Sequence, residues 1–371
     1  MRFFLSLIFI LFLSSKVSGQ SRLILSDAKA SQETKNLYAG LVGLSTRGIL
    51  FGHHDDLAYG VGWRGDKGRS DIKSVTGTFP ALYGWDLSGL EKNSEKDING
   101  IPFSDQKNWI KEVYERGGIN TFCWHLQNPV NQKSAWDTSI RTVKEILPGG
   151  KFHESYREYL NRIATYISQL KGDRGESIPI LFRPFHELTG TWFWWCRNTC
   201  SAEEFKGLWR FTIDYLRNTK GLHNLILVYS VADFKNKNDL LSRYPGDDYV
   251  DIIGFDAYCR NNVEQFISEL DHQLGLTVQF CKERGKIPAI PETGYQGIPQ
   301  ADWWTKVLLP IISRYPISYV MLWRNGGPDH FFAPYPGQLS AADFLQFSKS
   351  DRMIFQDGLN HQLLYSTPAG K

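Results

Sequence analysis

The sequence lacks the clusters of basic side chains that nucleic-acid binding requires. Its 42 Lys and Arg residues stand against 39 Asp and Glu, and no basic run occurs along the 371 residues. Because phosphate binding depends on such clusters, we expect no nucleic-acid partner. Charged residues make up only 22% of the chain and hydrophobic residues 42%, a balance that excludes a disordered protein.

Long apolar runs are equally scarce. One run extends from Phe3 to Leu13, broken only by Ser6, and small residues follow it at 17–19. It is far shorter than the roughly 20 residues that cross a bilayer, and no later stretch is long enough, so no membrane span is expected. The pattern is typical of a secretory signal peptide. We expect residues 1–19 to be removed and residues 20–371 to be secreted or periplasmic.

Cysteine is rare, with five residues in the whole chain. An odd number leaves at least one thiol free even in an oxidising compartment. Cys196 and Cys200 could close a small disulfide loop or remain as two buried thiols, and their spacing fits both readings. A tetrahedral zinc site would need two more ligands nearby, which the local sequence does not supply.

Eight short runs of apolar and β-branched residues recur along the chain. They are GILFGHH (48–54), FPALYGWD (79–86), INTFCWH (119–125), IPILFRPFHE (178–187), NLILVYS (224–230), VDIIGFDAY (250–258), KIPAIPETG (286–294) and ISYVMLWRN (317–325). Most of these runs are apolar along their length and do not alternate between apolar and polar residues. This is the pattern of strands that are buried on both faces of a parallel sheet.

Helical patterns fill the gaps between these runs. One begins with Ser104 as a plausible N-cap, and another carries the capping box of Ser201 and Glu204. Eight alternations without a linker predict an α/β fold, a single (β/α)8 TIM barrel over residues 20–371. An open doubly wound sheet would need a Gly-rich phosphate turn after its first strand, which this sequence lacks.

Chemistry in such a barrel is expected at the carboxyl ends of the strands. The residues found there are His53, His54, Trp85, Asp86, Trp124, His125, His186, Glu187, Tyr229, Asp256, Tyr258, Glu292, Trp323 and Arg324. Acids, histidines and large aromatics in apolar strands are costly to bury unless they share a wet cleft. Trp faces stack on pyranose rings and carboxylates bind hydroxyls, so this set indicates a sugar site.

Two of these residues, Glu187 and Glu292, form the minimum apparatus for cleaving a glycosidic bond. One carboxyl protonates the leaving oxygen while the other attacks or stabilises the anomeric carbon. Arg183 could keep one carboxylate ionised and Tyr258 could donate a hydrogen bond to it, which would separate the two pKa values. Each glutamate taken alone could instead be an ion-paired structural acid.

Four segments carry a specific resemblance. RPFHELTGTWFWW, PETGYQG, GFDAY and LWRNGGPDHFFAPYPG resemble glycoside hydrolase family 26, best known for β-mannanases with a retaining double-displacement mechanism on a (β/α)8 barrel. The likeness extends from about residue 49 to about residue 347. It implies that Glu187 is the acid/base and Glu292 the nucleophile.

The same resemblance implies roles in sugar binding. His186 would position the acid, Tyr258 would contact the nucleophile, and Trp323 would stack under the sugar at the cleavage point. Trp192 would line the leaving-group side. Sugar hydroxyls would be bound by Asp256, His125 and Arg324.

Two positions depart from the resemblance. Cys196 stands where many members of the family have Gly, and His54 where many have Gln. Neither is expected to touch the two carboxylates, so the class of chemistry carries over more securely than fine substrate preference. Retention predicts roughly 5–5.5 Å between the carboxyl groups of Glu187 and Glu292.

Two other clusters have simple structural interpretations. The residues at 53–56 look like metal ligands, but adjacent side chains of an extended segment diverge, so no metal or organic cofactor is expected. The aromatics at 192–195 cannot all point inward. We expect Trp192 in the cleft and at least one neighbour in the core.

The sequence therefore predicts a monomeric, retaining hydrolase of β-1,4-mannosidic bonds in mannan, galactomannan or manno-oligosaccharides. One alternative is a catalytically silent carbohydrate-binding barrel. Another is a β-xylan or mixed-linkage β-glucan hydrolase on the same scaffold. The long irregular stretch at 128–151 is expected to decide whether cutting is internal or from chain ends.

Overall fold

The computed structural model describes residues 23–366 of the chain. The expected signal peptide at 1–19 lies outside the described residues, so its cleavage stays a prediction. Among the residues that are described, no helix combines the length and apolar character needed to span a bilayer.

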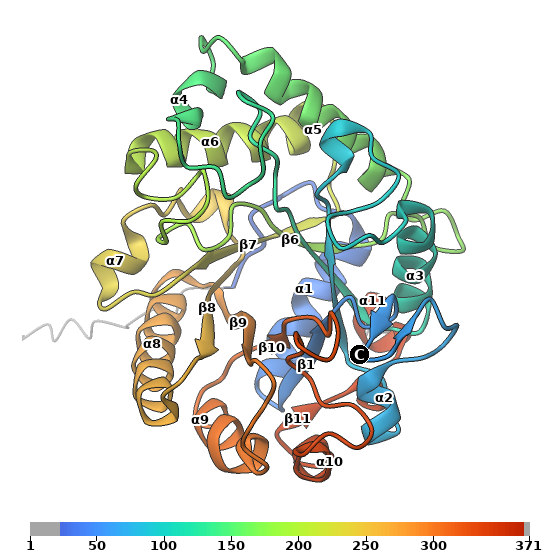
Figure 1. The fold of residues 1–371 in the computed structure, drawn as a ribbon. Helices are drawn as coiled ribbons and strands as arrows, with labels where there is room; N and C mark the ends of the chain where they lie inside the picture. Colours follow the sequence, from blue (N-terminus) through green and yellow to red (C-terminus); the bar gives the residue numbers. More distant parts are fainter. Residues whose placement is uncertain (1–22, 367–371) are drawn as a thin grey trace, which may run out of the picture.

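Eight parallel strands form the centre of the molecule (Figure 1). They are β1 (Ile49–His54), β4 (Leu82–Asp86), β5 (Ile119–Cys123), β6 (Ile180–Arg183), β7 (Leu225–Val231), β8 (Ile252–Cys259), β9 (Ile287–Tyr295) and β10 (Tyr319–Leu322). The last strand pairs with the first, Leu50 lying opposite Tyr319, and this pairing closes the barrel. Each strand lies inside one of the predicted runs or extends beyond it by one residue. The predicted (β/α)8 fold is therefore confirmed.

Helices surround the barrel and connect successive strands (Figure 1). They are α1 (Gln32–Ser45), α2 (Asp71–Thr76), α3 (Phe103–Glu115), α4 (Thr142–Ile146), α5 (His153–Ser168), α6 (Ala202–Asp214), α7 (Lys237–Leu241), α8 (Val263–Arg284), α9 (Leu309–Ile312), α10 (Ala341–Ser348) and α11 (His361–Tyr365). Short 3-10 or π turns lie at Leu90–Lys92, Tyr215–Thr219, Asp247–Tyr249, Trp304–Leu308 and Gln356–Gly358. Because helices cover the outside of the barrel, the strands are buried on both faces, which explains their continuous apolar sequence.

Of the two predicted helix caps, one is present in the structure and the other is not. At the start of α6, Ser201 accepts a hydrogen bond from the backbone of Glu204, whose side chain accepts one from the backbone of Ser201, so the capping box is confirmed. The prediction of Ser104 as an N-cap is wrong. Helix α3 begins at Phe103, after Pro102, and no side chain caps it. The fixed φ of proline prepares the backbone for a helix that starts immediately after it.

Three short strands were not predicted. The segment after β1 forms a hairpin of β2 (Tyr59–Gly60) and β3 (Trp63–Arg64), and β11 (Met353–Ile354) pairs with the start of β1. The Asp71 carboxylate holds the hairpin, accepting hydrogen bonds from the backbone of Val61 at 2.9 Å and from the indole of Trp63 at 2.7 Å. Pairs of residues are too short to show a period in the sequence.

All five cysteines are buried free thiols. Of the two readings left open by the sequence, the disulfide between Cys196 and Cys200 does not form. The Cys200 thiol instead lies 3.4 Å from the carbonyl oxygen of Trp195 and 3.3 Å from a guanidinium nitrogen of Arg243. The Cys196 thiol donates to the backbone carbonyl of Glu187 at 3.4 Å.

Candidate active site

Three carboxylates meet at the carboxyl ends of the strands. Oxygen atoms of Glu187, Asp256 and Glu292 lie within 4.8 Å of one another. Asp256 and Glu292 are opposite each other in the β8–β9 pairing, next to a bulge that follows Gly254. Bulges re-aim side chains beside functional sites, and barrel closure brings Glu187, in the turn after β6, to the same place.

The turn after β6 projects Glu187 into the cleft. Phe185 and Glu187 both adopt left-handed backbone conformations, with φ of 51° and 53°. Such angles are unfavourable for residues other than glycine and persist where the surroundings impose them. Here the backbone N–H of Glu187 donates to the carbonyl of Ser230 at 2.9 Å, while the Phe185 ring is buried against Trp195.

The Glu187 carboxyl lies in an environment that favours its protonated form. Burial, followed by the negative charges of Asp256 and Glu292, raises the pKa of Glu187 well above its usual range. Trp192 donates its indole N–H to Oε2 of Glu187 at 2.5 Å, which opposes part of that rise. A carboxyl in this environment is suited to give a proton to a bound ligand.

The Glu292 carboxylate accepts hydrogen bonds from two side chains on other strands of the barrel. It is 6% exposed, and Arg183 donates Nη2 to its Oε2 at 2.6 Å. The Tyr258 hydroxyl donates to its other oxygen. Burial and then the charge of Glu292 raise the pKa of Tyr258 well above its usual range, so this phenol stays a donor. A cation and a hydroxyl donor thus hold the two oxygens of Glu292 in place.

The second branch of Arg183 holds Asp256. Arg183 donates Nη1 to Asp256 at 2.7 Å, and the Ser230 hydroxyl donates to the other carboxylate oxygen at 2.6 Å. Burial raises the pKa of Asp256 to about 7 despite these contacts. One buried guanidinium thus joins the ends of β6, β8 and β9 below the cleft.

Two histidines and an aspartate form a buried chain beside Glu187. His125 Nδ1 lies 2.5 Å from Oδ2 of Asp86, and its Nε2 lies 3.2 Å from Nε2 of His186. Burial lowers the pKa of His186, so that ring is neutral. The His186 ring reaches His125, while its Nδ1 has no partner among the described residues. The expectation that His186 positions Glu187 stays a prediction.

Trp323 and Arg324 follow β10 on the far side of the barrel mouth from Glu187. The Trp323 indole stacks on His54, with centroids 4.4 Å apart and planes at 25°. Arg324 contacts the hydroxyl of Tyr59 at 3.4 Å, and that hydroxyl donates to Asp55. The β2–β3 hairpin therefore holds Arg324, a contact that the sequence did not reveal.

The side chains at 53–56 lie in two pairs, and Nε2 of His54 is 3.4 Å from Oδ1 of Asp55. His53 bonds to Asp56 at 2.8 Å, whereas Asp55 faces Tyr59 and His54 faces Trp323. In the part of the chain that the structure describes, these four residues do not bring their donor atoms together as a cluster.

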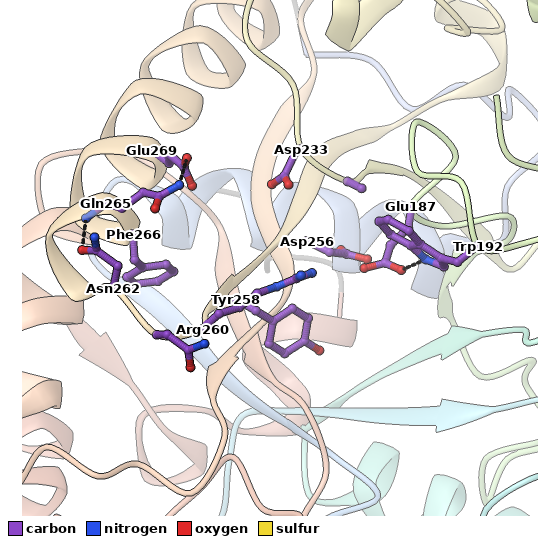
Figure 2. A pocket seen from close by; sticks show the side chains of 12 residues that line it. Glu187, Trp192, Asp233, Asp256, Tyr258, Arg260, Asn262, Gln265, Phe266 and Glu269 are labelled. Atoms are coloured by element: carbon purple, nitrogen blue, oxygen red, sulfur yellow. Dashed lines mark hydrogen bonds between the residues drawn. The ribbon is translucent and has the colours of Figure 1, made fainter. Parts of the chain in front are cut away.

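A cavity of about 370 Å³ begins at Glu187 and Trp192 and extends to the start of α8 (Figure 2). Asp256 and Tyr258 lie near Glu187, while Gln265 and Glu269 mark its far end. As expected, Trp192 borders this cavity.

The three aromatic residues that follow Trp192 in the sequence are buried. They are Phe193, Trp194 and Trp195.

A smaller cavity of about 220 Å³ lies beside His125, between the loops after β4 and β5. Trp136, from the long irregular stretch, stacks on His125 with centroids 5.2 Å apart and is 47% exposed. That stretch is anchored by Asn128, whose amide donates to Thr142 at 2.7 Å. It therefore lies against the predicted sugar-binding residues.

Sequence reasoning missed Asp86, Tyr59 and Ser230 as partners of the site. The position of Asp86 at a strand end is the signal that the sequence offers for it, but nothing in the sequence ties Asp86 to His125. Ser230 and Tyr59 contact site residues that are 26 and 265 positions away. Such contacts become visible only when the barrel closes.

The sequence-family comparison gives a clear result. The model of glycosyl hydrolase family 26 matches residues 26–304. A mannan endo-1,4-beta-mannosidase of Bifidobacterium adolescentis is 31% identical over 89% of the chain, and the match covers 35% of that relative's length. One from Bacillus subtilis is 28% identical over 79% of this chain and 80% of its own.

The solved structures agree with this result. A GH26 beta-mannanase from Bacteroides ovatus superposes with a TM-score of 0.89 at 41% identity, covering 92% of this chain and 99% of that one. A modular endo-beta-1,4-mannanase from Cellulomonas fimi gives 0.84 at 33% identity, covering 94% and 81%. The chain belongs to glycosyl hydrolase family 26.

Proposed function

We propose that the protein is a retaining hydrolase of β-1,4-mannosidic bonds that works by double displacement. The observation that carries the proposal is the spacing of Glu187 and Glu292, whose carboxylate oxygens approach within 4.8 Å while their environments differ. Retaining enzymes hold their two carboxyl groups about 5–5.5 Å apart, and inverting enzymes about 6.5–9.5 Å. The mannanase relatives support mannan as the substrate.

In the first step Glu187 gives its proton to the glycosidic oxygen. As that C–O bond breaks, an oxygen of Glu292 forms a bond to the anomeric carbon, and the leaving sugar departs with the proton. The Glu292 oxygens are already held by Arg183 and Tyr258, so little reorganisation precedes attack.

In the second step the ionised Glu187 takes a proton from water. The resulting oxygen attacks the anomeric carbon, the ester bond to Glu292 breaks, and both carboxyl groups return to their starting states. Once Glu292 is esterified it loses its negative charge, which lowers the pKa of Glu187 and suits it to act as a base.

The cleft supplies surfaces for sugars on both sides of this pair. Trp323 offers one indole face because His54 covers the other. Trp192 borders the cavity that we assign to the leaving group (Figure 2). Aromatic faces and hydroxyl-binding groups of this kind suit a neutral polysaccharide.

The test of the proposal is ¹H NMR of the first products from unbranched manno-oligosaccharides. Early release of the β-anomer supports retention, whereas the α-anomer contradicts it. Parallel reactions with β-xylan and mixed-linkage β-glucan distinguish the other hydrolase readings. Binding without turnover on any of the three would indicate a silent binding barrel.

We also propose that the protein is exported and acts as a monomer. The apolar run before Gln20 supports export. N-terminal sequencing of the protein recovered from its native cell should begin at Gln20, and light scattering should give the mass of one chain. An uncleaved N-terminus or a dimer mass would contradict these two proposals.

A further inference from the structure

We propose that Asp55 is a positioning residue that acts on a bound sugar through Tyr59 and Arg324. Neither Asp55 nor Tyr59 touches the sugar, and together they hold the Arg324 guanidinium where it meets a sugar hydroxyl. The inference rests on the proposed mannan hydrolysis, because the sugar-binding role of Arg324 belongs to that function. It gives a role to a buried carboxyl that the two catalytic steps do not use.

The ends of two paired strands bring these residues to the same side of the barrel mouth. Strands β1 and β10 pair in parallel as far as His53. One residue further along both strands, His54 stacks on Trp323 with ring centroids 4.4 Å apart. The next residues along the two chains are Asp55 and Arg324. Adjacent residues at the end of β1 therefore lie beside adjacent residues that are expected to meet the sugar.

Asp55 is held through both its backbone and its side chain. Its φ is 56°, and its N–H donates to the carbonyl of Gly84 at 2.9 Å. Aspartate tolerates this left-handed conformation better than most residues, so the backbone alone assigns no role. The carboxyl is buried, and its Oδ2 accepts hydrogen bonds from the Tyr59 hydroxyl and, at 2.9 Å, from the Asn99 amide. It thus joins the end of β1 to the β2–β3 hairpin and to the loop before α3.

The bond to Asp55 also sets the direction of the Tyr59 hydroxyl. A phenol has one proton, and because Tyr59 gives it to Asp55, the phenol oxygen can only accept from other groups. Nη1 of Arg324 faces this oxygen at 3.4 Å. Burial, followed by the negative charge of Asp55, raises the pKa of Tyr59 well above its usual range, so the hydroxyl keeps its proton.

Arg324 has few other groups to hold it. In the part of the chain that the structure describes, it forms no ion pair, and its Nε is buried without a hydrogen bond. Gly326 leaves room for the guanidinium, since a Cβ added there would lie 2.4 Å from Nη1. A cation with unused donors at the barrel mouth is suited to bind hydroxyls. Its orientation depends on the Tyr59 hydroxyl, and through it on Asp55.

The test measures sugar binding without turnover. Isothermal titration calorimetry with unbranched mannohexaose, with every variant built on Glu292→Ala, reports affinity independently of hydrolysis. Tyr59→Phe keeps the ring and removes the hydroxyl, and we expect it to raise Kd about fivefold or more. The matched control is Tyr215→Phe, in the turn after α6. The Tyr215 ring is also buried, its hydroxyl donates to Asn161 at 2.8 Å, and Kd should stay within about twofold.

Two further measurements separate positioning from damage to the fold. Asp55→Ala should weaken binding as Tyr59→Phe does. Asp55→Asn keeps an oxygen acceptor and tolerates the left-handed backbone, so it should restore most of the affinity. Tyr59→Phe should add no loss to Arg324→Ala, because its effect passes through that arginine. An undiminished effect of Tyr59→Phe without Arg324, or equal losses in Asp55→Asn and Asp55→Ala, would overturn the inference.

The two proposals fail in different ways. If the unaltered protein cleaves mannan but Tyr59→Phe binds mannohexaose as tightly as its Glu292→Ala parent, the positioning inference is wrong and the hydrolase proposal survives. If Tyr59→Phe weakens binding but the unaltered protein cleaves no β-mannan, the hydrolase proposal is wrong and the positioning role survives. A Glu292→Ala parent that does not bind mannohexaose would overturn the inference.

Discussion

Arg183 donates Nη2 to Oε2 of Glu292 at 2.6 Å, from a position where the arginine is only 1% exposed. Its other terminal nitrogen is taken by Asp256. A single buried cation thus holds two carboxylates in place, while Glu187 has no direct hydrogen bond to a cation in the described part of the chain. This asymmetry is the physical basis for assigning the proton to Glu187.

Replacing Arg183 with Met should destabilise the fold. The change leaves Glu292 and Asp256 buried without a cation, and breaking a buried ion pair in this way costs about 3–5 kcal/mol. Arg183 lowers the pKa of Asp256, so losing the cation raises that pKa further in the folded state and the loss of stability should grow as pH rises from 5 to 8. Urea unfolding at those two pH values measures it.

The control for that prediction is Arg157→Met. Arg157 pairs with Glu154 on the surface of α5, and exposed pairs contribute about 0–1 kcal/mol. A loss in Arg183→Met no larger than in the control, or one that shrinks as pH rises, would contradict the account.

Trp192→Phe should move the alkaline limb of the pH–rate profile to higher pH. The indole N–H stabilises the ionised form of Glu187 and so lowers its pKa, while Phe keeps most of the burial. Activity needs protonated Glu187, so a higher pKa extends activity upward in pH. The pH dependence of kcat/KM measures the limb.

Trp136→Phe is the matched change for this experiment. Its indole is 47% exposed and stacks on His125, and it has no hydrogen bond to a carboxylate in the described structure. The alkaline limb should stay in place. If Trp192→Phe moved the limb downward, the assignment of the proton to Glu187 would be wrong.

Glu187→Ala should slow the enzyme according to the leaving group. With manno-oligosaccharides, losing the general acid should cost about 10²–10⁴-fold in kcat/KM. A dinitrophenyl mannobioside has a leaving group that needs no proton, so its first step should be nearly unaffected. Burst kinetics separates the two steps, and equal first-step losses on both substrates would refute the general-acid role.

Asp86→Asn should disturb His125 without emptying the site. In the native protein the carboxylate accepts the Nδ1 proton of His125, and the amide can instead donate to that nitrogen. We expect kcat/KM to fall about 10–100-fold, by analogy with the loss of a carboxylate that orients a metal-bound histidine. Nitrogen-15 NMR should show Nδ1 of His125 without its proton.

Ser88→Ala supplies the comparison for Asp86. The Ser88 hydroxyl also contacts that carboxylate, at 2.8 Å, but on Oδ1, which accepts from the backbone of His125, whereas the His125 ring bonds Oδ2. Its loss should leave the His125 tautomer unchanged. If Asp86→Asn kept native activity and the native His125 tautomer, Asp86 would have no positioning role.

The sequence predicts most of the barrel because its signal is local. Continuous apolar runs mark strands buried on both faces, and the acids and aromatics that end them mark the mouth of the barrel. Glu187 and Glu292 were found in this way. The β2–β3 hairpin escaped because its strands have two residues each, and the Ser104 cap failed because Pro102 starts α3 earlier.

The contacts that tune the site escape sequence reasoning for a different reason. The left-handed backbone of Phe185 and Glu187 is imposed by surrounding contacts and leaves no mark in a sequence without glycine there. The hydrogen bond from Trp192 to Glu187 depends on that turn. Likewise, the single arginine shared by two carboxylates follows only from the pairing of β8 with β9.

The most direct test of the catalytic assignment is mass spectrometry of a trapped intermediate. A 2-deoxy-2-fluoro mannoside with a dinitrophenyl leaving group should esterify the protein once, because fluorine slows the second step. The account predicts that peptide mapping finds this ester on Glu292 and that Glu292→Ala stays unlabelled. An ester on Glu187, or rapid turnover by Glu292→Ala, would contradict it.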